Sequence, residues 1–183
     1  MNIKLFPIDN VEIDLLQKWQ NDVNIKYPLM GFRFPIQKKS IEKWLNDIRK
    51  ENGSNRVIYA IFVNEVALGM VSLHGIDYIN SKAFFGIYVT GEKNNKGIGF
   101  AATQLTLDFA FNAMGLNRVE LEVLISNKNA IHLYRRIGFK DEGIKRKSFF
   151  ADDKFMDVQI MSILKNEFIF DNTLLSSRLV LDF

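Results

Sequence analysis

The sequence predicts an α/β protein with a single mixed, mostly antiparallel sheet flanked by helices. Three strand-like segments follow one another between residues 56 and 90 with only short turns between them, which is typical of antiparallel neighbours. After residue 90, strands alternate with helices, and this alternation predicts parallel pairing. The length of 183 residues suits one domain, and no linker rich in Gly, Ser or Pro divides the chain.

The first fifty residues predict one strand and two amphipathic helices. Ile3–Phe6 is a short strand that Pro7 ends. Apolar residues then recur at helical spacing from Val11 to Trp19 and again from Ile41 to Ile48. Ser40 is the expected N-cap of the second helix, because its hydroxyl can accept a hydrogen bond from a free backbone N–H.

The rest of the chain predicts a hairpin, a further strand and two strand–helix alternations before a closing hairpin. The strand-like segments are rich in β-branched and aromatic residues, and a Gly-bearing loop precedes the longer helix. In order, these elements are Arg56–Val63, Val66–Ile76, Ala83–Thr90, the helix Phe100–Met114, Val119–Val123, the helix Asn127–Ile137, Phe139–Phe150 and Phe155–Leu164. The predicted order is β-α-α-β-β-β-α-β-α-β-β.

The composition excludes several kinds of chemistry. The chain has no Cys, which excludes thiol nucleophiles, disulfides and iron–sulfur clusters, and its two His do not make a metal site without carboxylates. We therefore expect no metal. The net charge of +3 allows an anionic partner, but there is no basic stripe with interleaved aromatics that would indicate nucleic acid. Without an apolar run of about 18 residues or a signal-like N-terminus, we expect no membrane and a cytoplasmic location.

The segment Asn94–Gly99 lies between a predicted strand and a predicted helix. The first N–H groups of a helix have no partner within it, and the helix dipole adds positive charge there. Gly97 and Gly99 lack side chains that would keep a phosphate away from these groups, and Lys93 and Lys96 add charge. A pyrophosphate is therefore a reasonable ligand, although a plain turn fits equally well. The loop matches neither a Walker P-loop nor a Rossmann site, which requires three spaced glycines.

A second motif follows at residues 127–139. Asn127 leads a helix with an apolar stripe formed by Ala130, Leu133 and Ile137, and Tyr134 lies off the centre of this stripe. Gly138 is a natural residue at the end of the helix.

Together the two motifs resemble the GNAT-type N-acetyltransferase superfamily. Gly97 and Gly99 match the glycines of its acetyl-CoA loop, and the later segment matches its pattern N-x-x-A-x-x-x-Y-x-x-x-G-F. The segment Trp19-Gln20-Asn21-Asp22 and the closing hairpin resemble the RimJ/RimL-like branch. The resemblance implies an N-acetyltransferase domain over residues 1–168. The apolar extension over 169–183 is then expected to pack on the domain or on a partner in a homodimer.

The resemblance implies acetyl-CoA as co-substrate and direct transfer to an amine in a ternary complex. It also implies that the strand ending at Val89 splays from the strand Val119–Val123, so that the pantetheine arm fills the gap. Tyr134 would protonate the leaving thiolate. The implied acetyl-CoA-binding residues are Ile87, Tyr88, Val89, Asn94, Asn95, Lys96, Gly97, Ile98, Gly99, Phe100, Asn127, Asn129 and Tyr134.

Two positions depart from the family pattern. Asn94 stands where Gln or Arg is usual, and Phe84 stands where the RimJ/RimL-like branch often has Glu. The missing carboxylate leaves the general base open. Glu120 and Glu122 lie two apart on one strand, so they share a face, and either is a candidate base or a salt-bridged strand residue. His132 is expected to point away from Tyr134.

The acceptor site is expected between the loop after the first helix and the closing hairpin. Its predicted residues are Tyr27, Met30, Arg33 and His74, although a structural role is the commoner one for such a histidine. Because no acidic run lies near these loops, the expected acceptor is a small amine such as an amino sugar or a nucleotide-linked amino sugar. The alternatives are a polyamine, a protein N-terminus as in the ribosomal-protein branch, and a non-enzymatic acetyl-CoA-binding regulatory module.

Overall fold

A computed structural model describes residues 3–31, 34–51, 53–90, 97–171 and 173 of the chain. The strands are β1 (Ile3–Pro7), β2 (Arg56–Val63), β3 (Val66–Asp77), β4 (Lys82–Val89), β5 (Arg118–Leu124), β6 (Lys140–Ala151) and β7 (Lys154–Leu164). The α-helices are α1 (Ile13–Asn21), α2 (Val23–Lys26), α3 (Lys38–Glu51), α4 (Ile98–Asp108) and α5 (Lys128–Ile137). The short helical turns are η1 (Ile8–Asn10), η2 (Phe109–Ala113) and η3 (Lys165–Glu167).

The strands form one seven-stranded sheet in the order β1-β2-β3-β4-β5-β7-β6. Every neighbouring pair is antiparallel except β4 and β5, which are parallel. The predicted mixed, mostly antiparallel sheet is therefore confirmed, and the predicted element order is confirmed apart from α2, which was not predicted. Among the described residues, the helices are too short or too polar to cross a bilayer.

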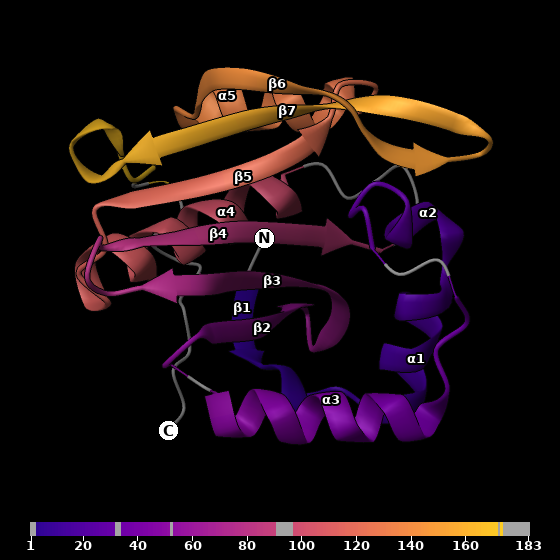
Figure 1. Cartoon of the computed structure of the whole chain (residues 1–183). Helices are drawn as coiled ribbons and strands as arrows, with labels where there is room; N and C mark the ends of the chain where they lie inside the picture. Colours follow the sequence, from indigo (N-terminus) through magenta and orange to yellow (C-terminus); the bar gives the residue numbers. More distant parts are fainter. Residues whose placement is uncertain (1–2, 32–33, 52, 91–96, 172, 174–183) are drawn as a thin grey trace.

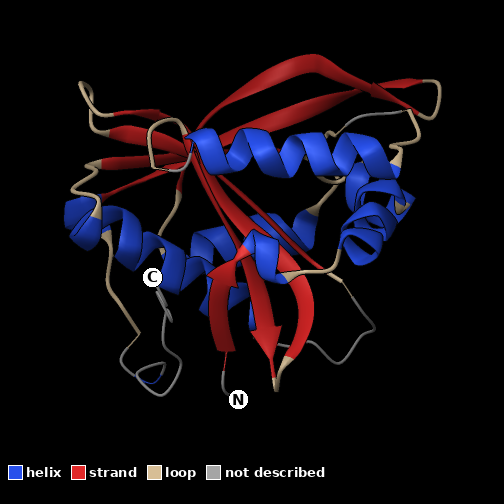
Figure 2. Cartoon of the chain, turned by 90° about the horizontal axis from the view of Figure 1, so that it is seen from below, coloured by secondary structure: helices blue, strands red, loops and turns tan. Residues whose placement is uncertain are grey.

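The sheet opens between β4 and β5. Only three pairs join these strands, and the last is Phe84 with Glu120. Beyond it β4 continues to Val89 beside β3, while β5 continues to Leu124 beside β7. We call the unpaired stretch after Phe84 the splayed gap. Figure 1 shows β4 and β5 diverging toward the side where α2 lies, and Figure 2 shows the strands fanning apart.

Two apolar cores cover the two faces of the sheet. On one face, α4 and α5 pack over a core that includes Leu107, Leu121 and Ile163. We call it the α4/α5 face. On the other, α1 and α3 pack over β2–β4 in a second core that includes Leu16 and Ala60. We call it the α1/α3 face. Buried and half-buried residues alternate along β5, so that its polar side chains lie on the α1/α3 face.

Both ends of α5 lie where the sequence predicted them, whereas the starts of α3 and α4 differ from the prediction. The side chain of Asn127 accepts a hydrogen bond from the Ala130 N–H at 3.3 Å, and Gly138 ends α5 with φ of 117°. The prediction of Ser40 as an N-cap is wrong, because α3 already begins at Lys38. Helix α4 begins two residues earlier than predicted, after Gly97.

The beginning of the C-terminal segment lies against α4 and η2. The ring of Phe168 is 5.4 Å from that of Phe111, and Phe170 packs beside Phe168. The Asp171 N–H donates a hydrogen bond to the buried Gln104 side chain at 3.0 Å. The remainder of the predicted extension, 174–183, lies outside the described residues, so the boundary at residue 168 and the role of 169–183 stay predictions.

Candidate active site

The start of α4 presents backbone N–H groups without helical partners. Gly97 precedes the helix with φ of 94°, a conformation that favours glycine, and the first helical hydrogen bond runs from the Ala101 N–H to the Gly97 carbonyl. Gly99 faces α5 instead, because a Cβ there would lie 3.4 Å from Leu133. The Arg136 guanidinium lies 4.5 Å from the centre of the Phe100 ring and brings positive charge to this end of α4. Predicted residues Asn94, Asn95 and Lys96 lie outside the described residues.

The end of β4 has one edge paired and one edge in the splayed gap. Ile87, Tyr88 and Val89 pair with β3, and none of them pairs with a described residue of β5. Backbone groups on such an edge can pair with an extended ligand as an added strand would. The Tyr88 side chain does not enter the gap. It is buried against Trp19, at 5.7 Å between ring centres, and burial raises the pKa of its hydroxyl.

Tyr134 lies at the start of the splayed gap on the α4/α5 face. Its ring is edge-on to Phe85, the first β4 residue beyond the last β4–β5 pair, and it also packs on Phe139. The expectation that Tyr134 lies off the centre of the apolar stripe is wrong: with Ile131 and Ile137 it forms the buried face of α5. Burial raises the pKa of Tyr134 to about 12, so its hydroxyl keeps its proton at neutral pH and can donate it.

The two predicted asparagines lie at the start of α5. The Asn127 side-chain oxygen is used in capping the helix, and Asn129 is exposed in the first turn. His132 is exposed while Tyr134 is buried, so the expectation that they point apart is confirmed.

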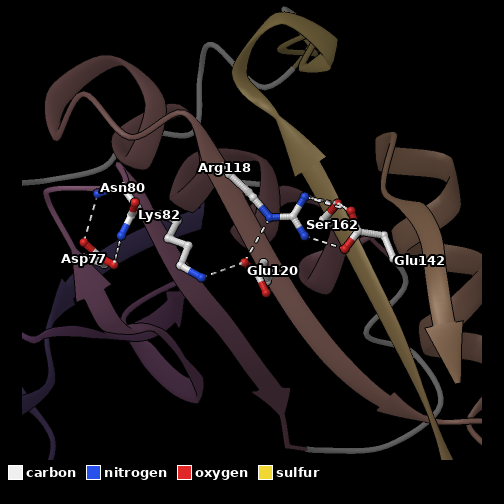
Figure 3. A network of polar contacts seen from close by, with 7 residues as sticks. All are labelled: Asp77, Asn80, Lys82, Arg118, Glu120, Glu142 and Ser162. Carbon is white, nitrogen blue, oxygen red and sulfur yellow. Dashed lines mark hydrogen bonds and ion pairs between the residues drawn. The ribbon is translucent and has the colours of Figure 1, made fainter. Parts of the chain in front are cut away.

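Glu120 and Glu122 share a face as predicted, and both are ion-paired. The Glu120 carboxylate lies 2.9 Å from Arg118 Nε and 3.5 Å from Lys82 Nζ. Arg118 also donates to the Glu142 carboxylate and, at 3.0 Å, to the Ser162 hydroxyl, so that these five side chains, Lys82 included, form one network beside the last β4–β5 pair (Figure 3). Glu122 lies next along β5 and is paired with Lys145 of β6.

His74 lies on the α1/α3 face and is exposed. Its ring stacks on Phe84 at 5.9 Å and 23°, and its Nδ1 is 3.5 Å from the Ser72 hydroxyl. Gly86 is next on the same face of β4. A Cβ built there would lie 3.0 Å from Ser72 Oγ and 3.9 Å from His74 Cε1, so glycine lets the Ser72 hydroxyl and the His74 ring lie close to the β4 backbone. We call this close approach the Gly86 contact.

The predicted acceptor loop is held to α1 by a residue that the sequence did not mark as functional. Asn21 accepts a hydrogen bond from the Ile36 N–H at 2.8 Å and donates one to the Ile36 carbonyl at 2.9 Å. Between these anchors lie Tyr27, which is half-buried at the end of α2, and Met30, which has φ of 53°. Arg33 lies outside the described residues. Among the described residues, no hydrogen bond or ring contact joins Tyr27 or Met30 to His74.

Comparisons with known proteins agree with this geometry. The sequence profile of the acetyltransferase (GNAT) domain family matches residues 3–140. The chain belongs to the GNAT acetyltransferase family. It is 30% identical to the spermidine N(1)-acetyltransferase of Escherichia coli K12 over 169 residues, which cover 92% of this chain and 89% of that protein. It is 33% identical to the spermidine N(1)-acetyltransferase of Vibrio cholerae over 102 residues, 56% of this chain and 59% of that protein.

The fold is also that of a solved GNAT-type structure. The crystal structure of Vibrio cholerae spermidine N-acetyltransferase with CoA and spermine has a TM-score of 0.84, with 24% identity, and the match covers 91% of this chain and 97% of that one. The family reaction uses acetyl-CoA as donor, so the chain is an acetyl-CoA-dependent N-acetyltransferase. The free N–H groups of α4 and the free edge of β4 fit this co-substrate. Among the described residues, no group of three or more acidic or His side chains is placed to hold a metal.

Proposed function

We propose that the chain transfers the acetyl group of acetyl-CoA directly to a primary amine of a small molecule in a ternary complex. The splayed gap carries this proposal, because it offers an unpaired β4 edge with Tyr134 packed at its start. No covalent enzyme intermediate is required, which suits a chain without Cys.

In this proposal the backbone and helix ends hold the co-substrate. The free edge of Ile87–Val89 pairs with the pantetheine arm, and the N–H groups at Gly97–Phe100 bind the pyrophosphate together with Asn94, Asn95 and Lys96. Asn127 and Asn129 add polar contacts from the start of α5. A backbone N–H near Val89 polarises the thioester carbonyl, and such donors each contribute on the order of 3–4 kcal/mol.

Tyr134 is the proposed proton donor to the leaving thiolate. Its raised pKa keeps the hydroxyl protonated until the thiolate forms. For the two carboxylates we propose different roles. Glu120, held by Arg118 and Lys82, fixes the start of the splayed gap. Glu122 has the single partner Lys145 and is the carboxylate that attracts the acceptor amine.

We propose an acceptor that carries neutral or anionic groups besides its amine, such as an amino sugar or a nucleotide-linked amino sugar. A polycation requires several available carboxylates at once, and Glu120 and Glu142 of the α1/α3 face are already paired with cations, which leaves Glu122 alone for the acceptor. The loop of residues 22–37 contains Lys26 and Arg33 and one acid. Tyr27, Met30, Arg33 and His74 are the proposed acceptor contacts, and the RimJ/RimL-like branch stays our assignment for the chain.

A polyamine is the second candidate, because two relatives are spermidine N(1)-acetyltransferases. The two candidates are separated by measuring thiol release from acetyl-CoA with a panel of hexosamines, a nucleotide-linked amino sugar, spermidine, spermine and a peptide with an N-terminal alanine. We expect the highest kcat/KM with an amino sugar. Spermidine as the best substrate would replace the proposed acceptor. Tight acetyl-CoA binding without turnover of any amine would leave the regulatory module as the better description.

A further inference from the structure

We propose that His74 is the general base that removes the proton from the acceptor ammonium. This inference rests on the proposed transfer to an amine and adds the proton acceptor that the transfer requires. It is carried by the position of the imidazole, which stacks on Phe84 at the start of the splayed gap, lies at the Gly86 contact and is on the opposite face of β4 from Tyr134.

The register of the sheet places His74 at the point where β4 and β5 part. His74 is opposite Phe84 on β4, and Phe84 is opposite Glu120 in the last β4–β5 pair. Successive β4 side chains alternate between faces, so that Phe84 and Gly86 lie on the His74 side and Phe85 lies on the Tyr134 side. An acyl group held along the free β4 edge would have a proton donor on one side and the imidazole on the other.

The Gly86 contact holds the imidazole against β4 while the ring stays exposed to solution, from which an amine can reach it. At this contact Ser72 Oγ and His74 Cε1, the ring carbon between the two nitrogens, lie closest to Gly86. Nδ1 is within 3.5 Å of Ser72, while Nε2 has no hydrogen bond to a described residue. With the hydrogen on Nδ1 and directed at Ser72, the lone pair of Nε2 is free to accept a proton.

Among the described charged and titratable groups around His74, the imidazole is the one suited to accept the proton of the ammonium. Arg56 faces it from β2 and is itself paired with Glu51, while Lys82 and Glu120 lie beyond Phe84 on β4 and β5. Asp77, at the end of β3, is held by the backbone and side chain of Asn80. Desolvation, followed by the positive charge of Arg56, lowers the pKa of His74 below 6.5, so the ring is neutral at pH 7 and can take up a proton.

The proposed step is balanced in protons and electrons. The ammonium gives one proton to His74 Nε2, and the resulting free amine attacks the thioester carbonyl carbon. A C–N bond forms, the C–S bond breaks, and the thiolate takes a proton from Tyr134. The second amine proton leaves as the amide forms and restores the tyrosine hydroxyl, and the imidazolium loses its proton to solvent. The net products are an amide, a thiol and one proton.

The two histidines of the chain provide a matched test. His74→Gln should lower kcat/KM for the best amine of the panel roughly a hundredfold, and His132→Gln, on the exposed side of α5, should leave it unchanged. The wild-type pH profile of kcat/KM should fall below an apparent pKa under 6.5, and this acid limb should be lost in His74→Gln. Added imidazole should restore part of the activity of His74→Ala. Equal activity of wild type and His74→Gln, or an unchanged acid limb, would overturn the proposal.

Two further measurements separate this inference from the proposed function. The CoA dissociation constant should be the same in wild type and His74→Gln, because His74 is not part of the co-substrate site. Nuclear magnetic resonance of the His74 ring should give a pKa below the usual value of a histidine, and CoA together with an amine should shift the His74 signals. If no amine is acetylated but an amine still shifts the resonance signals of His74, the proposed function fails, whereas the proposed position of His74 beside the bound amine is supported. If no amine of the panel shifts His74, the inference fails.

Discussion

The two faces of β4 differ sharply at the start of the splayed gap. On the α4/α5 face, Phe85 is buried and touches Tyr134 within a continuous apolar core. On the α1/α3 face, one residue away in sequence, Gly86 lets Ser72 approach the strand closely next to the exposed His74. One strand therefore separates a buried face from one that is exposed to solution at His74. Acetyl transfer requires both, because the thioester must be held away from water and the amine must enter from solution.

The largest predicted effect on kcat comes from a substitution on the α4/α5 face. Tyr134→Phe keeps the ring contacts with Phe85 and Phe139 and removes only the hydroxyl. We expect kcat to fall roughly a hundredfold, with the CoA dissociation constant unchanged. Steady-state kinetics and calorimetric titration with CoA measure the two quantities.

Tyr59→Phe is the matched control for that substitution. Tyr59 is also buried in the core of the α4/α5 face, has its pKa raised to about 12 by burial, and packs edge-on against Phe109, but it lies on β2 away from the gap. Its loss of a hydroxyl should leave kcat as it is. An equal fall in both variants would mean that kcat responds to core packing and that Tyr134 is not the proton donor.

A smaller effect on the reaction is expected when the Gly86 contact is disrupted. Gly86→Val adds a β-branched side chain at a position where even a Cβ lies 3.0 Å from Ser72 Oγ, so Ser72 and the neighbouring His74 must shift. We expect kcat/KM for the amine to fall about tenfold or more, while CoA binding is kept. Gly143→Val on β6 is the control, because a Cβ there meets nothing within 4 Å. Unchanged amine kinetics in Gly86→Val would show that the placement of Ser72 and His74 against β4 does not matter for the amine.

The contrast between the faces also explains what the sequence could predict. Alternating apolar residues and the spacing of turns were enough for the sheet, and Asn127 and Gly138 marked the two ends of α5 correctly. These features depend on local spacing. Helix α2 was missed because four residues are too short for an apolar period, and Tyr134 was misplaced because a tyrosine in a helix suits both a surface and a core.

The α1/α3 face of β4 depends on contacts between strands that are distant in sequence. The Gly86 contact exists because β3 places Ser72 and His74 beside Gly86, and no local pattern encodes that register. The partners of Glu120 and Glu122 are likewise cross-strand: Lys82 comes from β4 and Lys145 from β6. The shared face of the two acids followed from their spacing, whereas their ion pairs did not.

The smallest predicted effect is on stability, and it comes from the ion-pair network around Arg118 beside the last β4–β5 pair. Arg118→Met keeps the apolar stem and removes the donor to Glu120, Glu142 and Ser162. After allowance for solvent screening, we expect the free energy of unfolding to fall by about 1 kcal/mol. Arg135→Met, which breaks the exposed pair with Asp141, should cause no measurable change in urea unfolding.

The pH dependence of the stability difference between wild type and Arg118→Met tests whether the charge of Arg118 or the packing of its stem stabilises the fold. The hydrogen bond from Arg118, and then that from Ser162, hold the pKa of Glu142 below its usual 4.5. A carboxylate with a depressed pKa stabilises the fold above its unfolded pKa and loses that contribution as the pH falls through the lower folded value. The stability gap between wild type and Arg118→Met should therefore be full at pH 7 and shrink below about pH 4.5. A gap of the same size at pH 3 and pH 7 would mean that Arg118 supports the sheet through its packed stem, and the start of the splayed gap would then be held by shape and not by charge.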